Sequence, residues 1–392
     1  MGYDPGVFSA RTRWDRTVNR LAALTARKRA AGVRVLDLTE TNPTRVGLQG
    51  LPGLLAALAD PGALSYDPDP RGTASARQAV SADYGRRGLH VDPDRIVLTA
   101  STSEAYAFVF KLLCNPGDEV LVPRPSYPLF DYLAGLESVT VKPYPLAYHD
   151  EWRIDVRALE DAVGARTRAI VVVNPNNPTG SFLKSDEAGA LHDLAAAAGL
   201  ALVSDEVFAD YPWRPHEPRA PSLAHDGAAL AFALGGLSKS CGLPQLKLAW
   251  MAVAGPTALR EEALARLDLV ADTYLSVGTP VQRAAPALLA RAPELRAPIA
   301  ARVAANLRVL EDHAGRGGPA SLLRGEGGWS AVLRVPATLG EEERIVALLE
   351  EQDVLVHAGY FFDFPREAYL VPSLLPAPDE FAEAVRRIFR ML

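Results

Sequence analysis

The stretch AIVVVNPNNPTG, residues 169–180, decides the fold class, because a short apolar run leads directly into a chain of turn residues. A helical pattern follows at residues 186–199, and a second apolar run, ALVSDE, occupies residues 201–206. Apolar runs of four to six residues that alternate with helices are typical of a parallel sheet buried between two layers of helices. Two Asn-Pro steps and a glycine make the backbone after the first run extended and then turned, which holds Asn177 at the end of a strand.

The same alternation continues toward the N-terminus. The run IVLTA at 96–100 precedes a helical pattern at 101–113, and EVLVPRP at 119–125 precedes another at 126–136. We therefore predict an α/β fold with a mostly parallel central sheet flanked by helices. Ligands of such sheets collect at the carboxyl ends of the strands.

The pattern changes after about Pro280, where helices and strands alternate in a smaller α+β arrangement. An amphipathic helix is expected between about Arg11 and Ala31, and it shares the core of this smaller part. We predict a large domain at residues 45–280 and a small domain built from residues 1–44 and 281–392. The elements expected after Pro280 are helices at 291–313, 341–352 and 378–391 and strands within 326–336 and 353–357.

Composition excludes several classes of protein. Of 392 residues, 48% are hydrophobic and 22% are charged, which excludes intrinsic disorder. The net charge of −6 provides no positive field for nucleic acid, and two cysteines, Cys114 and Cys241, suit a reducing compartment. No signal-peptide core and no run of ~18 apolar residues is present, so we expect a cytoplasmic protein without nucleic-acid or membrane partners.

The start of the pattern at 101–113 carries the residues Ser-Thr-Ser-Glu. Ser101 and Glu104 have the spacing of a capping box, which by itself explains the pattern. The alternative is an anion site, because free backbone N–H groups and the hydroxyls of Ser101, Thr102 and Ser103 meet at the positive end of a helix dipole.

Two further motifs bear ionisable groups. Asp205 and Glu206 end an apolar run, and a buried carboxylate requires a cation partner. Lys239 is one of only six lysines, and it follows an apolar run within the small-residue stretch LGGLSKSCG at 234–242. Partial desolvation lowers the pKa of such an amine and favours a Schiff base with a carbonyl compound. A lone loop lysine is more often simply solvated.

Taken in chain order, the four motifs are the helix start at 101–104, N-P-N-N-P-T-G at 174–180, the strand end at 205–206 and the lysine stretch at 234–242. Together they resemble the class I/II aminotransferases, a family of fold type I pyridoxal-phosphate enzymes. The matching residues are the asparagine of N-P-T-G, the aspartate of a D-E-x-Y strand end and the lysine of S-K, here Asn177, Asp205 and Lys239. The resemblance covers nearly the whole chain. It implies pyridoxal 5′-phosphate as cofactor and a reaction that moves an amino group between an amino acid, or a related amine, and an oxo acid.

The resemblance also assigns roles. Lys239 holds the cofactor as an internal aldimine and then moves the proton at substrate Cα, and Asp205 keeps the pyridine nitrogen protonated. Asn177 donates to the ring oxygen, and Tyr127 stacks on the ring. Tyr66 reaches the phosphate in the neighbouring subunit, which implies a homodimer with composite sites. The remaining implied cofactor-binding residues are Ser101, Thr102, Ser103, Phe208, Ser238 and Lys247.

Three positions near the cofactor depart from the family pattern. Phe208 replaces the tyrosine whose hydroxyl binds the ring oxygen, Gly236 replaces a serine that commonly binds the phosphate, and Lys247 replaces an arginine. Loss of the hydroxyl raises the pKa of the aldimine. An ammonium group neutralises a phosphate but lacks the two-pronged grip of a guanidinium.

The substrate side departs further. Val371 stands where the family has the arginine that grips the substrate α-carboxylate, so either Arg366 or Arg324 replaces it or the substrate is held differently. Thr41 stands where a glycine is common. Asn42 beside it offers an amide to a polar substrate, although turn chemistry is the commoner role for an Asn before Pro.

The missing arginine keeps a second reaction class open: a pyridoxal-phosphate lyase, decarboxylase, racemase or cyclising enzyme. A third reading is a pyridoxal-phosphate-dependent transcription regulator. It lacks support, because only about forty residues precede the sheet pattern and no recognition-helix segment is visible. The position of Cys241, two residues after Lys239, is explained by packing alone.

Overall fold

The computed structural model describes residues 6–366 and 368–392, and in this part of the chain the largest sheet has eight strands. All of its strands run parallel except β9 and β5, so the predicted mostly parallel sheet is confirmed. In sheet order the strands are β2 (Ile96–Thr99), β9 (Ala249–Ala254), β8 (Ala231–Gly236), β7 (Ala201–Asp205), β6 (Thr167–Val173), β3 (Glu119–Arg124), β4 (Thr140–Tyr148) and β5 (Trp152–Ile154).

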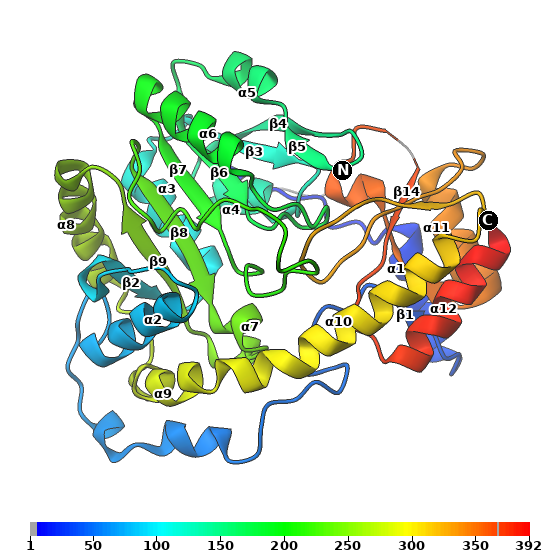
Figure 1. The fold of residues 1–392 in the computed structure, drawn as a ribbon, viewed down its shortest axis with the longest axis horizontal. Helices are drawn as coiled ribbons and strands as arrows, with labels where there is room; N and C mark the ends of the chain where they lie inside the picture. Colours follow the sequence, from blue (N-terminus) through cyan, green and yellow to red (C-terminus); the bar gives the residue numbers. More distant parts are fainter. Residues whose placement is uncertain (1–5, 367) are drawn as a thin grey trace.

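Helices cover both faces of this sheet (Figure 1). Alternate side chains of one strand enter different cores, because successive residues point to opposite faces. Val171 and Val203 pack with α3 and α8, whereas Ile170 and Leu202 pack with α6. The helices around the sheet are α2 (Ala74–Arg86), α3 (Thr102–Leu113), α4 (Leu129–Leu136), α5 (Val156–Ala162), α6 (Ser185–Ala198), α8 (Thr257–Tyr274) and α9 (Thr279–Ala290).

A smaller lobe combines the two ends of the described chain. Strand β1 (Leu36–Asp37) pairs with β12 (Val354–Leu355), and α1 (Arg20–Ala30) packs against α11 (Glu341–Gln352). Helix α10 (Ala292–Ala314) extends from the large sheet to this lobe (Figure 1). The other elements of the lobe are β10 (Ser321–Leu322), β11 (Leu333–Arg334), β13 (His357–Ala358), β14 (Tyr369–Val371) and α12 (Pro378–Met391).

The packing of α9 bears on the division between the two parts. Its buried residues Val281, Ala285 and Leu288 share a core with Val80 of α2 and Ile96 of β2. The helix that begins near the expected boundary therefore packs with the large sheet. The division into residues 45–280 and the two terminal segments remains a prediction.

The N-terminal helix is shorter than predicted. It begins at Arg20 and not near Arg11, because the Asn19 side chain accepts a hydrogen bond from the backbone N–H of Ala22 at 2.8 Å and caps the helix there. Among the described helices, none has the length and apolar character needed to cross a bilayer. The short helical segments are η1 (Ala10–Thr12), η2 (Leu54–Ala59), η3 (Pro61–Leu64), η4 (Pro93–Arg95), α7 (Leu237–Ser240), η5 (Pro244–Leu246) and η6 (Gly359–Phe362).

Candidate active site

Lys239 lies in α7, directly after strand β8, and its amine faces aromatic rings. Its Nζ is 4.9 Å from the ring centroid of Trp329 and 5.5 Å from that of Phe208. Burial in this apolar setting lowers the pKa of Lys239 to about 8, although the charge of Asp205 opposes the shift. The structure thus places this lysine in a desolvated position, and at neutral pH a larger fraction of its amine is unprotonated than in a lysine with the ordinary pKa of 10.5.

Asp205 ends strand β7, which is the neighbour of the lysine's strand. The hydroxyl of Tyr106 donates to its Oδ2 and the backbone N–H of Val207 donates to its Oδ1, both at 3.2 Å. Burial nevertheless raises the pKa of Asp205 to about 6. Because β7 and β8 are parallel, their ends bring the carboxylate of Asp205 and the amine of Lys239 to the same edge of the sheet.

The second acid of the strand end, Glu206, has separate partners. Its Oε1 accepts hydrogen bonds from the Ser204 hydroxyl at 3.0 Å and from the Leu223 backbone N–H at 2.9 Å. Burial raises the pKa of Glu206. These contacts tie Glu206 to the loop that contains Leu223, so Asp205 is the acid available to a ligand beside Lys239.

The loop around Lys239 is anchored through its backbone. Tyr211 donates its hydroxyl to the Lys239 carbonyl at 2.6 Å, and Arg296 donates its Nε to the Ser240 carbonyl at 2.7 Å. Arg296 also forms an ion pair with Asp210 at 3.1 Å. The lysine backbone is therefore held from two sides, while its amine stays free of these contacts.

Cys241 continues this loop and is only 2% exposed. Burial raises the pKa of its thiol to about 12, which keeps the sulfur protonated and weakly reactive. Its environment agrees with a packing role.

The N-P-N-N-P-T-G loop follows strand β6 at the same edge of the sheet. The Asn174 backbone N–H donates to the Asp205 carbonyl at 2.8 Å, which joins the loop to the acid, and Asn177 is half-buried. Gly180 has a φ of +71°, and a Cβ there would lie 2.6 Å from the Gly327 carbonyl oxygen. This position requires glycine, which lets the loop lie directly against the segment that precedes Trp329.

The start of α3 has both bonds of the predicted capping box. Ser101 Oγ accepts from the Glu104 backbone N–H at 3.2 Å, and Glu104 Oε2 accepts from the Ala100 backbone N–H at 2.7 Å. The Ser101 hydroxyl is therefore used in capping, whereas Thr102 and Ser103 lie half-buried in the first turn. Since β2 runs in the same direction as β7 and β8, this helix start lies at the same edge as Lys239.

Lys247 approaches that edge from strand β9. Ala249, at the start of β9, is paired with both Thr99 at the end of β2 and Gly236 at the end of β8. Lys247 precedes Ala249 by two residues and is exposed, with a φ of +51°. The antiparallel direction of β9 thus brings this cation next to the start of α3. Ser238, beside Lys239, is half-buried at the same edge.

The two tyrosines implied by the resemblance are more open to solvent. Tyr127 follows strand β3 and is 46% exposed. Tyr66 is 77% exposed and lines a cavity together with Gly72 and Gln282.

The substrate side is apolar where the family pattern has its arginine. Val371, in strand β14, is 1% exposed and pairs across the sheet with His357 of β13. The imidazole of His357 stacks on Phe361 with 4.5 Å between ring centroids. Burial lowers the pKa of His357 to about 4, so this ring is neutral at physiological pH. The cross-strand neighbour of Val371 therefore adds no positive charge.

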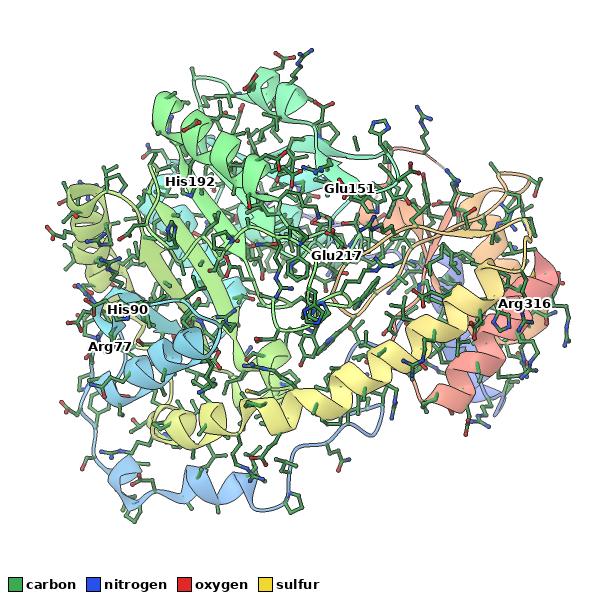
Figure 2. The ribbon with its side chains drawn as sticks, viewed as in Figure 1. Arg77, His90, Glu151, His192, Glu217 and Arg316 are labelled. Carbon is green, nitrogen blue, oxygen red and sulfur yellow. The ribbon has the colours of Figure 1, made fainter. Side chains whose placement is uncertain are left out.

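The other predicted substrate residues are engaged elsewhere or exposed. Arg324 donates to Glu217 Oε1 at 2.9 Å, and Figure 2 labels Glu217 in the central part of the view. Arg366 and Thr41 are exposed. Asn42 Oδ1 accepts from the backbone N–H of Thr44 at 3.0 Å and from its hydroxyl at 2.8 Å, which is the turn chemistry considered for this residue.

Sequence reasoning did not single out Tyr106, Tyr211 or Trp329. Tyr106 lies one helical turn after Thr102, so the helical period places both on one side of α3 and was an available signal. Tyr211 and Trp329 are far apart in sequence, and their rings meet at 5.1 Å between centroids. Only the packed fold brings them together at Lys239.

Comparison with known proteins agrees with this geometry. Residues 39–374 match the family model described as aminotransferase class I and II. An alanine aminotransferase of Mycobacterium tuberculosis (strain ATCC 25618 / H37Rv) is 28% identical over 379 residues, which cover 94% of this chain and 87% of that protein. The S-alkyl-thiohydroximate lyase SUR1 of Arabidopsis thaliana is 32% identical over 232 residues, which cover 58% and 50% of the two chains.

The fold comparison extends over both lobes. The alanine aminotransferase from Pyrococcus furiosus superposes with a TM-score of 0.88 at 22% identity and covers 98% of this chain and 99% of its own. The chain belongs to the class I and II aminotransferase family. The predicted family, fold class and aminotransferase activity are confirmed.

Proposed function

We propose that this aminotransferase holds pyridoxal 5′-phosphate on Lys239 and moves an amino group between an amino acid and an oxo acid. The observation that carries the proposal is the pair formed by Lys239 and Asp205 at the ends of β8 and β7. One is an amine whose pKa burial lowers to about 8, and the other is a carboxylate held by Tyr106. Pairs of ionisable groups with shifted pKa values are typical of catalytic sites.

The residues at this edge fit the chemistry of the cofactor. The amine of Lys239 suits its aldehyde, and the carboxylate of Asp205 suits its ring nitrogen. The hydroxyls of Thr102 and Ser103 and the free N–H groups at the start of α3 suit its phosphate, with Lys247 as a nearby cation. When bound, the cofactor supplies an electron-withdrawing ring that stabilises negative charge at substrate Cα.

The protein's own groups would then act as follows. Lys239 takes the proton from substrate Cα and returns it, and a pKa near 8 suits a group that must both accept and release a proton. Asp205 keeps the ring nitrogen protonated, and the Tyr106 hydroxyl orients its carboxylate. Tyr211 holds the lysine backbone by its bond to the Lys239 carbonyl.

We further propose that Asn177 binds the cofactor ring oxygen and that Ser101, Ser238, Phe208 and Tyr127 complete the cofactor site. Ser101 Oγ accepts the capping bond from the Glu104 N–H, which leaves its own O–H to donate to a phosphate oxygen. We propose a homodimer in which Tyr66 reaches the partner's site. The 77% exposure of Tyr66 and the 93% exposure of Leu64 support it, because a second subunit would cover both side chains.

Cofactor binding is tested first. Purified protein loaded with pyridoxal 5′-phosphate is expected to be yellow, and borohydride should fix the cofactor to the peptide that contains Lys239. K239A should lose this covalent label and its turnover. K142A is the matched control, because Lys142 lies on strand β4 and its amine donates to the carbonyl of Ala162 in α5. A protein that takes up no cofactor contradicts the proposal.

The reaction is tested with amino acids supplied without an acceptor. Alanine is the first donor to try, since two similar proteins carry that name. Conversion of the cofactor spectrum to the amine form, with release of the oxo acid, supports transamination. Release of ammonia, carbon dioxide or a side-chain substituent identifies the lyase or decarboxylase class instead.

A further inference from the structure

Two aromatic side chains, Phe208 and Trp329, flank the amine of Lys239. Their rings meet edge to face with centroids 5.3 Å apart. The phenyl ring of Phe208 has no hydrogen-bond donor, whereas an indole carries one N–H donor and no acceptor. Of these two rings, only Trp329 can donate a hydrogen bond to a ligand atom beside Lys239.

The indole N–H of Trp329 is buried and has no hydrogen-bond partner among the described residues. The residue itself is 2% exposed. The indole of Trp213 donates to the Gly328 carbonyl at 2.9 Å. The indole N–H groups of Trp152 and Trp250 also have no partner among the described residues, but these rings pack in the cores around the sheet, whereas the ring of Trp329 lies at Lys239. A buried donor without a partner costs free energy, and at a binding site such a donor indicates that the ligand brings the acceptor.

The backbone around Trp329 is fixed on both sides. The Gly328 N–H donates to the Tyr211 carbonyl at 3.0 Å, and the Leu374 N–H donates to the Trp329 carbonyl at 2.7 Å. A Cβ at Gly327 would lie 2.8 Å from the Tyr211 carbonyl oxygen, so this approach requires glycine. These contacts hold the indole beside Lys239 before any ligand arrives.

We propose that the indole N–H of Trp329 donates a hydrogen bond to the phenolic oxygen of the bound cofactor ring and so replaces the donor that Phe208 lacks. The inference rests on the proposed attachment of the cofactor to Lys239. In pyridoxal phosphate the aldehyde carbon and the phenolic oxygen are on adjacent ring carbons, so a bond to the lysine amine brings that oxygen next to Nζ. An anionic oxygen gains more from a donor than a neutral one does.

The titratable groups around this position are limited in the described structure. Asp205 faces it from β7, with the Tyr106 hydroxyl of α3 bonded to Asp205. The Tyr211 hydroxyl is bonded to the Lys239 carbonyl. Both hydroxyls already have a partner other than the ring oxygen. Removal of the Trp329 donor should therefore change the pKa of the Lys239–cofactor adduct.

The test is the pKa of the adduct, measured from the pH dependence of its visible absorbance. W329F keeps an aromatic ring but removes the N–H together with part of the indole, and the loss of the donor is expected to raise this pKa by about one unit, the size of one hydrogen bond to a charged group. W213F is the matched control, because its lost N–H served the Gly328 carbonyl, and it should leave the pKa unchanged. An unchanged pKa in W329F overturns the inference.

Rescue distinguishes the donor from general packing. F208Y in the W329F protein supplies a hydroxyl and should lower the raised pKa back toward the wild-type value. If W329F does not fold, F208Y in the otherwise unchanged protein provides the second test. With Trp329 already donating, it should lower the pKa by less than about half a unit, whereas a fall of about one unit or more contradicts the inference. A wild-type protein that forms no adduct refutes the proposed function instead.

Discussion

The cofactor half and the substrate half of the candidate site differ in what they retain of the family pattern. At the ends of β7 and β8 the ionisable pair Asp205 and Lys239 is present and buried. In strand β14 the buried Val371 stands where the sequence resemblance led us to expect the carboxylate-binding arginine. The groups that we propose to hold the cofactor are present, whereas the arginine expected for an α-carboxylate is not. Cofactor chemistry therefore follows from the fold more securely than substrate identity does.

The two halves also differ electrostatically. The cofactor half holds a carboxylate and an amine whose pKa values burial moves to about 6 and about 8. The substrate half places His357, with a pKa lowered to about 4, opposite Val371. Burial disfavours the charged forms of Asp205 and Lys239, so keeping these two ionisable groups costs stability. Opposite Val371, the ring of His357 is neutral at physiological pH. Substitutions in each half should therefore affect activity and stability in opposite proportions.

The largest effect is expected from Asp205→Asn. The amide cannot hold a proton on the ring nitrogen, so turnover should fall about 10²- to 10³-fold, as for other losses of a buried electrostatic contact. E206Q, at the same strand end, should lose far less, because Glu206 is bonded to Ser204 and Leu223. Steady-state kinetics of the two variants measure the difference, and equal losses would contradict the distinct roles of the acids.

The same substitution should stabilise the protein without cofactor. The folded pKa of Asp205, about 6, lies above its ordinary 3.8, so the native state becomes less stable as pH rises from 3.8 through 6. At pH 8 the D205N protein should gain roughly 3 kcal/mol in urea unfolding, since the pKa is raised by about two units and one unit corresponds to about 1.4 kcal/mol. A loss of stability would mean that Asp205 is a structural carboxylate.

Val371→Arg should act mainly on stability. A guanidinium in this 1% exposed strand position would be buried without a partner, at a cost of about 3 kcal/mol. V371L is the size control and should cost less than about 1.5 kcal/mol. Urea unfolding measures both. If V371R is as stable as wild type and binds amino acids more tightly, the substrate half is open to a carboxylate and the contrast between the halves fails.

Much of the fold was predictable because strand and helix patterns are local. The apolar runs at residues 169–173 and 201–205 became β6 and β7, and residues 341–352 and 378–391 became helices as predicted. Strand β9 was not predicted. Its antiparallel direction could not be read from the sequence, because its apolar residues resemble those of the parallel strands on either side. The predicted start of the N-terminal helix near Arg11 was wrong, because the cap at Asn19 makes the helix begin at Arg20.

The candidate site was predictable to the extent that it lies on motifs. Asp205 ends a strand and Lys239 follows one, and parallel strands end at the same edge of the sheet. Tyr106 was missed although the helical period places it on the same side of α3 as Thr102. Trp329 was missed because it comes from a segment 90 residues beyond Lys239 in the sequence. Its contact with Lys239 depends on tertiary packing, which no local pattern encodes.

A smaller effect concerns pH. Only the unprotonated amine attacks an aldehyde, so cofactor attachment should speed up as pH rises through the Lys239 pKa of about 8. Between pH 7 and pH 8 the reactive fraction grows roughly fivefold, from about a tenth to a half. Stopped-flow absorbance measures the rate. D205N should shift the midpoint to lower pH, because Asp205 raises the pKa of Lys239, and a midpoint near 10 would show a solvated lysine.

The smallest effect is expected at Asn42, in the substrate half. Asn42→Ala removes the acceptor for the Thr44 N–H and hydroxyl and should cost about 1 kcal/mol in urea unfolding. Asn42→Asp keeps that acceptor, loses the amide donor and adds a negative charge. If Asn42 serves the turn alone, the Asp variant retains wild-type stability and KM. If its amide binds a substrate, KM rises while stability is kept, and the substrate half then contains a polar contact that compensates in part for the missing arginine at position 371.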